Sequence, residues 1–274
     1  MVLQAESAQG RLFLKCSAEI FRHECVVTRA LAAHQPDLLP EVVAVEPDQG
    51  WLLMRDLGAA ELGDQDEALW FEGVVALAGL QQEWLGRTAE LTALGLPTRS
   101  LATLAEVVRS WSEDDEMLAR MSAELRARWD AAAPALEEDC LRLDRIGPGS
   151  SILHGDFHPW NVTFGAGRTR IFDWTDACAS HPFVDLATYV YRAKQPDVRR
   201  QLMDSYLARW HEHLPDADLA EAGRLALVVG ALDQVQTYRT LRPTLMAGDV
   251  MYGADVDWVK RALTRRERGL DSPT

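Results

Sequence analysis

The sequence predicts an α+β protein with two lobes: a small antiparallel sheet carrying one helix, then a larger, mainly helical part. The first 57 residues contain four short apolar runs around one helical segment. From Asp64 onward, segments with apolar residues at helical spacing predominate. Within this second part, Ser151–Asp173 places polar side chains between short strand-like runs. We therefore expect lobes over residues 1–57 and 58–274.

The predicted small lobe has the order strand, strand, helix, strand, strand. Its strands are short apolar-rich runs bounded by turn residues, at Val2–Ser7, Arg11–Cys16, Val42–Val45 and Trp51–Met54. Its helix, Ala18–His34, has apolar residues near helical spacing and ends before Pro36. These elements predict a four-stranded antiparallel sheet with a single helix.

The predicted large lobe is mostly helical. A variant capping box, Asp64-x-x-Glu67, is expected to start its first helix. A break is expected near Pro134, because proline disrupts a helix interior. The expected helices are Asp64–Leu85, most of Leu101–Leu143, Phe183–Lys194, Asp197–His211, Asp216–Leu241 and Asp255–Arg268.

Composition and charge exclude several classes of function. A formal net charge of −14 argues against nucleic acid as the main partner, since phosphate binding needs a basic surface. The same charge is compatible with a cationic substrate, although solubility explains it equally well. The chain has no apolar run of membrane-spanning length and no secretory signal at its start. The four cysteines form no C-x-x-C pair, so we expect reduced thiols, no zinc site and a cytoplasmic location. The oligomeric state is left open.

The stretch Ser151–Asp173 concentrates side chains that carry chemistry, namely His154, Asp156, His158, Asn161 and Asp173. Four residues separate Asp156 from Asn161, and a Gly-Ala-Gly turn predicts a hairpin before Asp173. A kinase catalytic loop uses the same Asp–Asn interval and a later metal-binding Asp. The layout therefore predicts a phosphoryl-transfer site.

The residue types suit this chemistry. A carboxylate on a rigid loop, here Asp156, can orient an acceptor hydroxyl and take its proton. Asn161 and Asp173 offer the hard oxygen ligands that magnesium prefers. Upstream, Lys15 lies on a predicted strand and Glu24 on the following helix. In kinases such a pair orients the α- and β-phosphates of the nucleotide.

The segments HGDFHPWNV (154–162) and IFDWTDA (171–177) resemble the aminoglycoside phosphotransferase and choline kinase family, which are kinase-like small-molecule phosphotransferases. The resemblance implies a protein-kinase-like fold and ATP-dependent transfer of the γ-phosphate to a hydroxyl of a small molecule. It implies Asp156 as catalytic base and Asn161 with Asp173 as Mg²⁺ ligands. It also implies that His154 and Asp185 support the loop.

The resemblance extends to the small lobe. Met54 ends a strand similar to the one that leads to the family's hinge, whose backbone at Arg55–Leu57 is then expected to contact adenine. The family has a strand pair with a phosphate-covering loop before the lysine strand. Here 14 residues precede Lys15, and Gly10 is the only glycine among them. We therefore expect a small lobe without a Gly-rich loop, either because the lobe is abbreviated or because the sequence is truncated at its N-terminus.

The acceptor site is less clearly indicated. Three residues beside the predicted catalytic residues are candidates to contact an aminoglycoside-, choline- or sugar-like acceptor, namely Trp160, Trp174 and Asp176. An aromatic ring or a carboxylate would favour an acceptor that carries a cationic group. Weaker candidates are the acidic cluster Glu113–Glu116 and the later residues Asp233, Gln234 and Tyr238.

Two alternatives to the kinase hypothesis stay open. The missing Gly-rich loop favours a kinase-like binding or scaffold protein with weak or no catalysis. A more remote alternative is a metal-dependent phosphohydrolase built on Asp156, His158 and Asp173, although this scheme gives Lys15 and Glu24 no role.

Overall fold

A computed structural model describes residues 1–8, 10–242, 251 and 253–272. The chain forms two compact units. The first unit comprises residues 1–98 and 150–182, and the second comprises residues 99–149 and 183–274. The boundary predicted near residue 57 falls inside the first unit, at the connector that follows the sheet, and stays a prediction.

The sheet of the first unit has the strand order β1-β2-β4-β3, with every neighbouring pair antiparallel. Its strands are β1 (Val2–Ser7), β2 (Gly10–Cys16), β3 (Val42–Glu46) and β4 (Trp51–Arg55). The helix α1 (Glu24–His34) buries Val27 and Leu31 completely. The predicted antiparallel sheet with one helix is confirmed. The helix begins later than expected, since a 3-10 turn at Glu19–Phe21 precedes it.

A connector and two helices follow the sheet. The connector contains the 3-10 turns η3 (Leu62–Asp64) and η4 (Glu67–Leu69), and the helices are α2 (Trp70–Glu83) and α3 (Thr88–Ala93). The predicted capping box is wrong, because Asp66 rather than Asp64 caps this segment. The Asp66 side chain accepts a hydrogen bond from the Ala68 amide at 2.9 Å.

Residues 150–182 add two small antiparallel ladders to the first unit. One pairs β5 (Ser151–Leu153) with β8 (Cys178–Ser180). The other is the predicted hairpin of β6 (Val162–Gly165) and β7 (Arg168–Ile171). Its turn residues Ala166 and Gly167 both have positive φ, 50° and 71°, as a tight two-residue hairpin turn requires.

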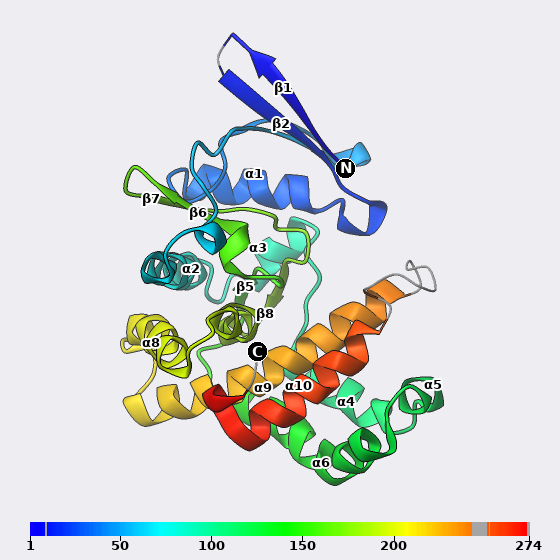
Figure 1. The fold of residues 1–274 in the computed structure, drawn as a ribbon. Coiled ribbons are helices and arrows are strands. Elements are labelled where there is room, and N and C mark those ends of the chain that lie inside the picture. The colour runs from blue at the N-terminus through cyan, green and yellow to red at the C-terminus, as the bar shows by residue number, and fades with distance from the viewer. Residues whose placement is uncertain (9, 243–250, 252, 273–274) are drawn as a thin grey trace. The chain divides into compact units, whose positions relative to one another are not determined.

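The second unit is helical. Its helices are α4 (Leu101–Trp111), α5 (Asp115–Ala119), α6 (Ala123–Ile146), α7 (Leu186–Tyr189), α8 (Pro196–Leu207), α9 (Asp216–Leu241) and α10 (Ala254–Arg268). The 3-10 turns η6 (Pro182–Asp185), η7 (Val190–Arg192), η8 (Ala208–Trp210) and η10 (Gly269–Asp271) adjoin α7, α8 and α10. Helix α9 forms the centre of the core, with residues 225–235 all buried, and α10 packs along it (Figure 1).

The predicted helix over Leu101–Leu143 is three helices rather than one with a break at proline. Asp114 accepts a hydrogen bond from the Met117 amide, and Ser122 accepts one from the Leu125 amide, so each caps a new helix. Helix α6 runs through Pro134 without a break. Pro134 is exposed, so water can bond the carbonyl that loses its helical partner.

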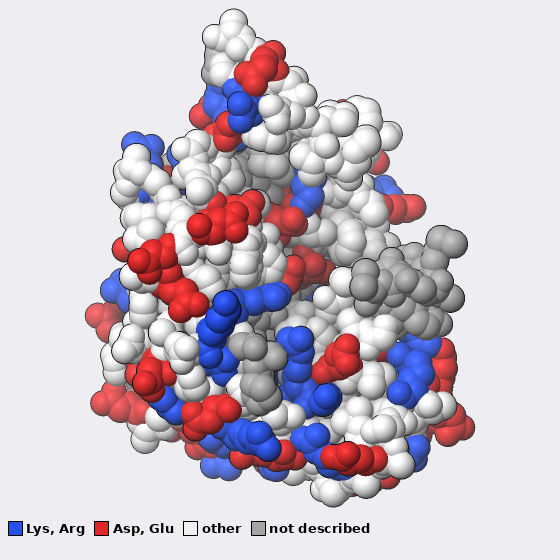
Figure 2. All heavy atoms as spheres, viewed as in Figure 1, with Lys and Arg blue, Asp and Glu red and all other residues white. Residues whose placement is uncertain are grey.

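Charged side chains of both signs are interspersed on the face shown in Figure 2. Among the described residues, no helix is both long and apolar enough to cross a membrane.

One ion pair within the second unit is largely buried. Arg120 donates two hydrogen bonds to Asp255, from Nη1 at 2.7 Å and from Nη2 at 2.6 Å, and the Asp255 side chain is almost fully buried. Burial acts to raise the pKa of Asp255, but the hydrogen bonds and charge of Arg120 outweigh it and hold that pKa below its usual value.

We predict that Arg120→Met destabilises the protein by about 3–5 kcal/mol at pH 7, because it leaves Asp255 buried and unpaired. Urea unfolding measures the change, with Arg120→Met/Asp255→Leu as the matched control, which should lose less. Since the folded-state pKa of Asp255 is depressed, the pair stabilises the protein above the unfolded pKa near ~4. This stability is lost as the pH falls through the folded value. Equal losses in the single and double variants would contradict the prediction.

Candidate active site

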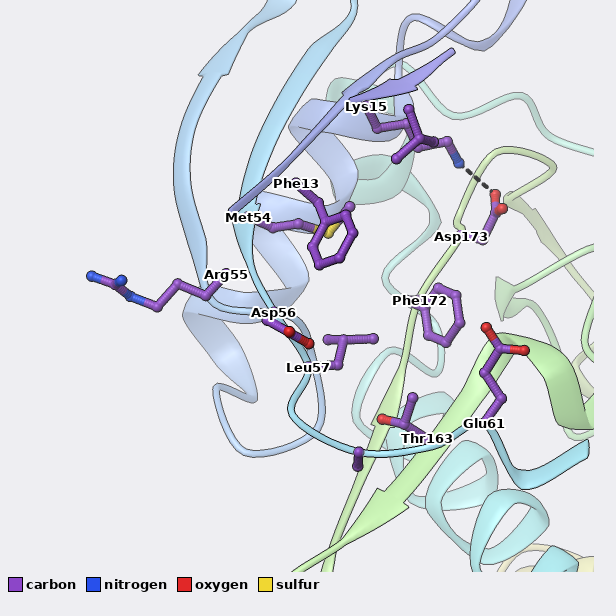
Figure 3. A pocket seen from close by; sticks show the side chains of 12 residues that line it. Phe13, Lys15, Met54, Arg55, Asp56, Leu57, Glu61, Thr163, Phe172 and Asp173 are labelled. Atoms are coloured by element: carbon purple, nitrogen blue, oxygen red, sulfur yellow. Dashed lines mark hydrogen bonds and ion pairs between the residues drawn. The ribbon is translucent and has the colours of Figure 1, made fainter. Parts of the chain in front are cut away.

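Lys15 joins three parts of the first unit in one polar cluster. Its Nζ lies 2.6 Å from Glu24 Oε1, 2.6 Å from Asp173 Oδ1 and 2.9 Å from Thr175 Oγ1. Lys15 lies on β2, Glu24 is the first residue of α1, and Asp173 follows β7. Figure 3 shows the contact between Lys15 and Asp173. The structure thus brings together three residues that the sequence places in one site.

The charges in this cluster support one another. Burial acts to lower the pKa of Lys15, but the carboxylates of Glu24 and Asp173 outweigh burial and raise it. Burial likewise acts to raise the pKa of Asp173, but Lys15 and the Thr175 hydroxyl outweigh it and lower that pKa. Lys15 and Asp173 are therefore both charged at neutral pH.

Three polar neighbours that the sequence did not indicate complete the cluster. Ser17 Oγ donates to Glu24 Oε2 at 2.6 Å, and Thr175 Oγ1 donates to Asp173 Oδ1. His23 Nε2 lies 3.0 Å from the Thr175 carbonyl oxygen. The only sequence signal for these residues is that each lies within two positions of Lys15, Glu24 or Asp173.

His154, which is expected to support the predicted catalytic loop, is completely buried. Its Nε2 lies 2.9 Å from the Phe172 carbonyl oxygen, and the Asp156 amide donates to its Nδ1 at 3.4 Å. Burial lowers the pKa of His154, so the ring is neutral. The neutral ring therefore donates from Nε2 and accepts at Nδ1, which ties Asp156 to the strand end before Asp173.

Backbone contacts fix the rest of the loop. Asn161 Nδ2 donates to the Asp156 carbonyl oxygen at 2.9 Å, and the Phe172 amide donates to the Asn161 carbonyl oxygen at 3.0 Å. Gly155 has φ +85°, and a Cβ there would lie 2.2 Å from the Asp176 carbonyl oxygen. The loop can therefore approach residue 176 only with glycine at this position.

Asp173 and Asn161 offer the ligand types that Mg²⁺ prefers, a carboxylate and an amide oxygen. Asn161 uses its Nδ2 on the Asp156 carbonyl, which leaves its Oδ1 for a cation. Among the described residues, no group of three or more His, Cys, Asp or Glu side chains is arranged to hold a metal. A kinase-type site needs no such group, since nucleotide phosphates and water complete the coordination. The residues fit Mg²⁺ that binds together with a nucleotide.

An apolar cavity of about 330 Å³ adjoins the cluster in the first unit (Figure 3). Lys15 and Asp173 lie at one end of it. Its apolar lining includes Val2, Phe13, Met54, Leu57 and Phe172. Figure 3 shows Phe13 and Phe172 pointing into this space from different segments.

The predicted hinge residues Arg55 and Leu57 both line the cavity, but their backbone and side-chain contacts differ. The Leu57 carbonyl accepts a hydrogen bond from Arg170 Nη1 at 3.2 Å, whereas the Leu57 amide has no hydrogen-bond partner among the described residues. The Arg55 side chain points away from the cavity (Figure 3) and pairs with Glu41 at 2.6 Å. A backbone donor is therefore available at Leu57, whereas the Arg55 side chain is engaged in its ion pair with Glu41.

The candidate acceptor residues differ in accessibility. Trp174 is completely buried, with its ring 4.7 Å from that of His154, so we leave it out of the acceptor site. Trp160 is 36% exposed and donates from Nε1 to Asp64 at 3.1 Å. Asp176 is half-buried and carries the carbonyl that faces Gly155.

The remaining candidates lie in the second unit. Asp185 is buried in η6, where its carbonyl accepts the Thr188 hydroxyl, and its expected role under the loop stays a prediction. The Asp233 carboxylate oxygen Oδ2 lies 3.6 Å from Arg99 Nη1. The remaining weaker candidates are Gln234, which is buried, Tyr238, which is half-buried, and the cluster Glu113–Glu116, in which Asp114 and Glu116 pair with Arg239 and Arg242.

Glu61 is a cavity residue that the sequence did not single out. It follows the hinge and lines the cavity beside Thr163 (Figure 3). Burial and the neighbouring Asp64 raise the pKa of its carboxyl, against an opposing effect of His158. No motif marks Glu61, because its position depends on how the connector packs against β6, which bridges it at Thr163.

Comparison with solved structures shows a protein-kinase-like fold. The macrolide 2′-phosphotransferase MphH from Brachybacterium faecium is 19% identical, with a TM-score of 0.62 over 94% of this chain and 88% of that one. A choline/ethanolamine kinase family protein from Mesorhizobium loti is 16% identical, with a TM-score of 0.64 over 94% and 85%. An APH(2″) enzyme solved with GDP and kanamycin is 15% identical, with a TM-score of 0.62 over 96% and 92%.

Residues 11–236 match the phosphotransferase enzyme family, so the chain belongs to this family. The matched residues include both the Lys15 strand and the loop from His154 to Asp173. Among curated proteins, none matches the sequence.

We predict that Gly155→Ala destabilises the protein by about 2–5 kcal/mol, since a methyl group adds a clash with the Asp176 carbonyl to an unfavourable positive φ. Gly167→Ala is the matched control, because Gly167 also has positive φ but nothing within 4 Å of an added Cβ. That variant should lose only about 1–2 kcal/mol. Urea unfolding of both variants measures the difference, and equal losses would show that the close approach at Gly155 has no energetic effect.

Proposed function

We propose that this protein is an ATP-dependent kinase that transfers the γ-phosphoryl group to a hydroxyl of a small molecule. One observation carries the proposal: Lys15, Glu24 and Asp173 meet in a charged cluster at the end of an apolar cavity. Membership of the phosphotransferase enzyme family supports it.

The cavity suits the base of a nucleotide. Its volume is in the range of small-molecule sites, and its apolar lining with aromatic rings favours a flat ring system. The Leu57 amide would donate to the base, and Glu61 would accept from the ribose hydroxyls. Lys15, at the charged end, would then meet the phosphates.

Mg²⁺ would be held by Asp173 and Asn161 and would neutralise charge on the phosphate oxygens when bound. Lys15 contacts Asp173 directly at 2.6 Å, so its ammonium occupies one carboxylate oxygen of that residue. We expect Lys15 to turn toward the phosphates when nucleotide binds, with Glu24 holding its other side.

Asp156 would orient the acceptor. A bond forms between the acceptor oxygen and the γ-phosphorus, and the bond from that phosphorus to the ADP oxygen breaks. The hydroxyl proton passes to the Asp156 carboxylate, which is 44% exposed and so open to a substrate. The products are the phosphorylated acceptor and ADP.

The acceptor class is proposed only in outline, as an aminoglycoside-, choline- or sugar-like molecule. The neighbouring structures are named for macrolide, choline or ethanolamine, and kanamycin. Asp176 and the exposed part of Trp160 are the acceptor contacts that we retain, and a cationic group on the acceptor would suit them. The cysteines Cys16, Cys25, Cys140 and Cys178 are all free thiols, which supports a cytoplasmic location.

A second candidate function is a kinase-like binding protein. The observation that favours it is that Ser7 of β1 pairs with Gly10 of β2, and the sequence before Lys15 has no glycine other than Gly10 with which to build a glycine-rich phosphate loop. Binding of Mg-ATP without turnover of any acceptor would support this alternative.

We predict that Asp156→Asn lowers kcat by about 10²–10⁴-fold, because the acceptor loses its base. A coupled ADP-release assay over amino alcohols, sugars and aminoglycosides measures turnover. The control variant is Asp37→Asn, which changes an exposed carboxylate elsewhere in the first unit and should keep wild-type turnover. Wild-type activity in Asp156→Asn would show that Asp156 is not the base.

We predict that Lys15→Met abolishes stabilisation by Mg-ATP. A ligand at 100 times its Kd should stabilise the wild-type protein by about 2.7 kcal/mol, visible as a rise in Tm. The chain has three lysines, Lys15, Lys194 and Lys260, and the exposed Lys260→Met is the matched control. A thermal shift in Lys15→Met as large as in Lys260→Met would argue against a phosphate-binding role.

A further inference from the structure

His158 lies against the carboxylate of the proposed base. Its Nε2 is 3.5 Å from Asp156 Oδ2, and its side chain is only 17% exposed. A carboxylate can only accept a hydrogen bond, so Nε2 can donate to Asp156 only when it carries a proton. A neutral ring that makes this hydrogen bond is the Nε2–H tautomer, whose Nδ1 is an acceptor.

That Nδ1 atom is buried and has no hydrogen-bond partner among the described residues. A buried polar atom without a partner is uncommon in folded proteins and calls for an explanation. The backbone at this residue serves the loop, since the Asn161 amide donates to the His158 carbonyl at 2.9 Å. The ring therefore meets Asp156 through Nε2 and also lies near the Glu61 carboxyl.

Packing rather than a second hydrogen bond sets the direction of the ring. The Trp160 ring meets it edge to face, with centroids 6.0 Å apart. Trp160 is itself fixed by its bond to Asp64 and by Gly63, where a Cβ would lie 2.3 Å from the indole. The connector therefore holds Trp160, and Trp160 holds the imidazole against the loop.

We propose that His158 is a positioning residue that fixes the Asp156 carboxylate, with Nε2–H directed to Oδ2 so that the other oxygen faces the acceptor hydroxyl. A carboxyl group that is 44% exposed can sample several rotamers, and only some of them suit an acceptor. This inference rests on the proposed function of Asp156 and adds to it a second residue that acts through the base.

The test is a double-mutant cycle on kcat. His158→Leu should lower kcat by about tenfold or more in the wild-type background, but by less than about twofold in Asp156→Asn, because the carboxylate that it positions is gone. Thermal unfolding confirms that each variant is folded. No loss in the wild-type background, or the same loss in both, would overturn the proposal.

Two conservative variants separate the two ring nitrogens. The Gln side chain places its amide nitrogen near the position of Nε2, whereas that of Asn ends near Nδ1. His158→Gln should therefore keep more of the wild-type kcat than His158→Asn. Equal loss in both variants would overturn the assignment to Nε2.

A spectroscopic readout does not depend on activity. With ¹⁵N-labelled histidine, the ring signals missing from His158→Gln identify His158, and their coupling pattern at pH 8 gives the tautomer. We expect Nε2–H in the wild-type protein and loss of that preference in Asp156→Ala. If the tautomer of His158 is the same in Asp156→Ala as in the wild-type protein, the proposed contact is wrong, whether or not an acceptor is turned over. If the contact is present but no acceptor is turned over, the proposed kinase function fails and the positioning contact stands.

Discussion

The contact of Lys15 with Glu24 and Asp173 is the interaction on which the site depends. Glu24 is almost completely buried, and removing a charge of this kind from water is costly unless it is paired. One ammonium satisfies two carboxylates from different segments, so β2, α1 and the end of β7 are held in one geometry. The apolar cavity has Lys15 and Asp173 of this cluster in its lining.

The loop beside the cluster is held by contacts that are mostly local. His154 is neutral in its buried position and links the Asp156 amide to the Phe172 carbonyl. Asn161 links the Asp156 carbonyl to the same strand end. Gly155 permits the approach to residue 176. The contacts of His154, Asn161 and Gly155 therefore explain why these residue types occur in the motif. These contacts fix the backbone of Asp156 and do not involve its carboxylate.

The sheet and the hairpin were predictable because their signals are short in range. Alternating apolar residues and turn residues define the strands, and Ala166–Gly167 defines the hairpin turn. The helix boundaries were not predictable to the same degree. Asp114 and Ser122 interrupt one long apolar pattern by capping new helices, and Pro134 is accommodated because it faces water. These outcomes depend on which face of a helix is covered, which a single sequence does not state.

The sequence by itself determined the Asp156–Asn161 interval, indicated Asp156 as the candidate base and indicated the pairing of Lys15 with Glu24, because motif spacing on one loop and one strand–helix unit carries them. The tertiary structure decided the rest. Lys15 and Asp173 are 158 residues apart, and the roles of Glu61 and Thr175 become visible only when such segments meet. Trp160 and Trp174 have the same side chain and lie equally near the motif. Packing exposes the first and buries the second, because the fold chooses which ring fills the core.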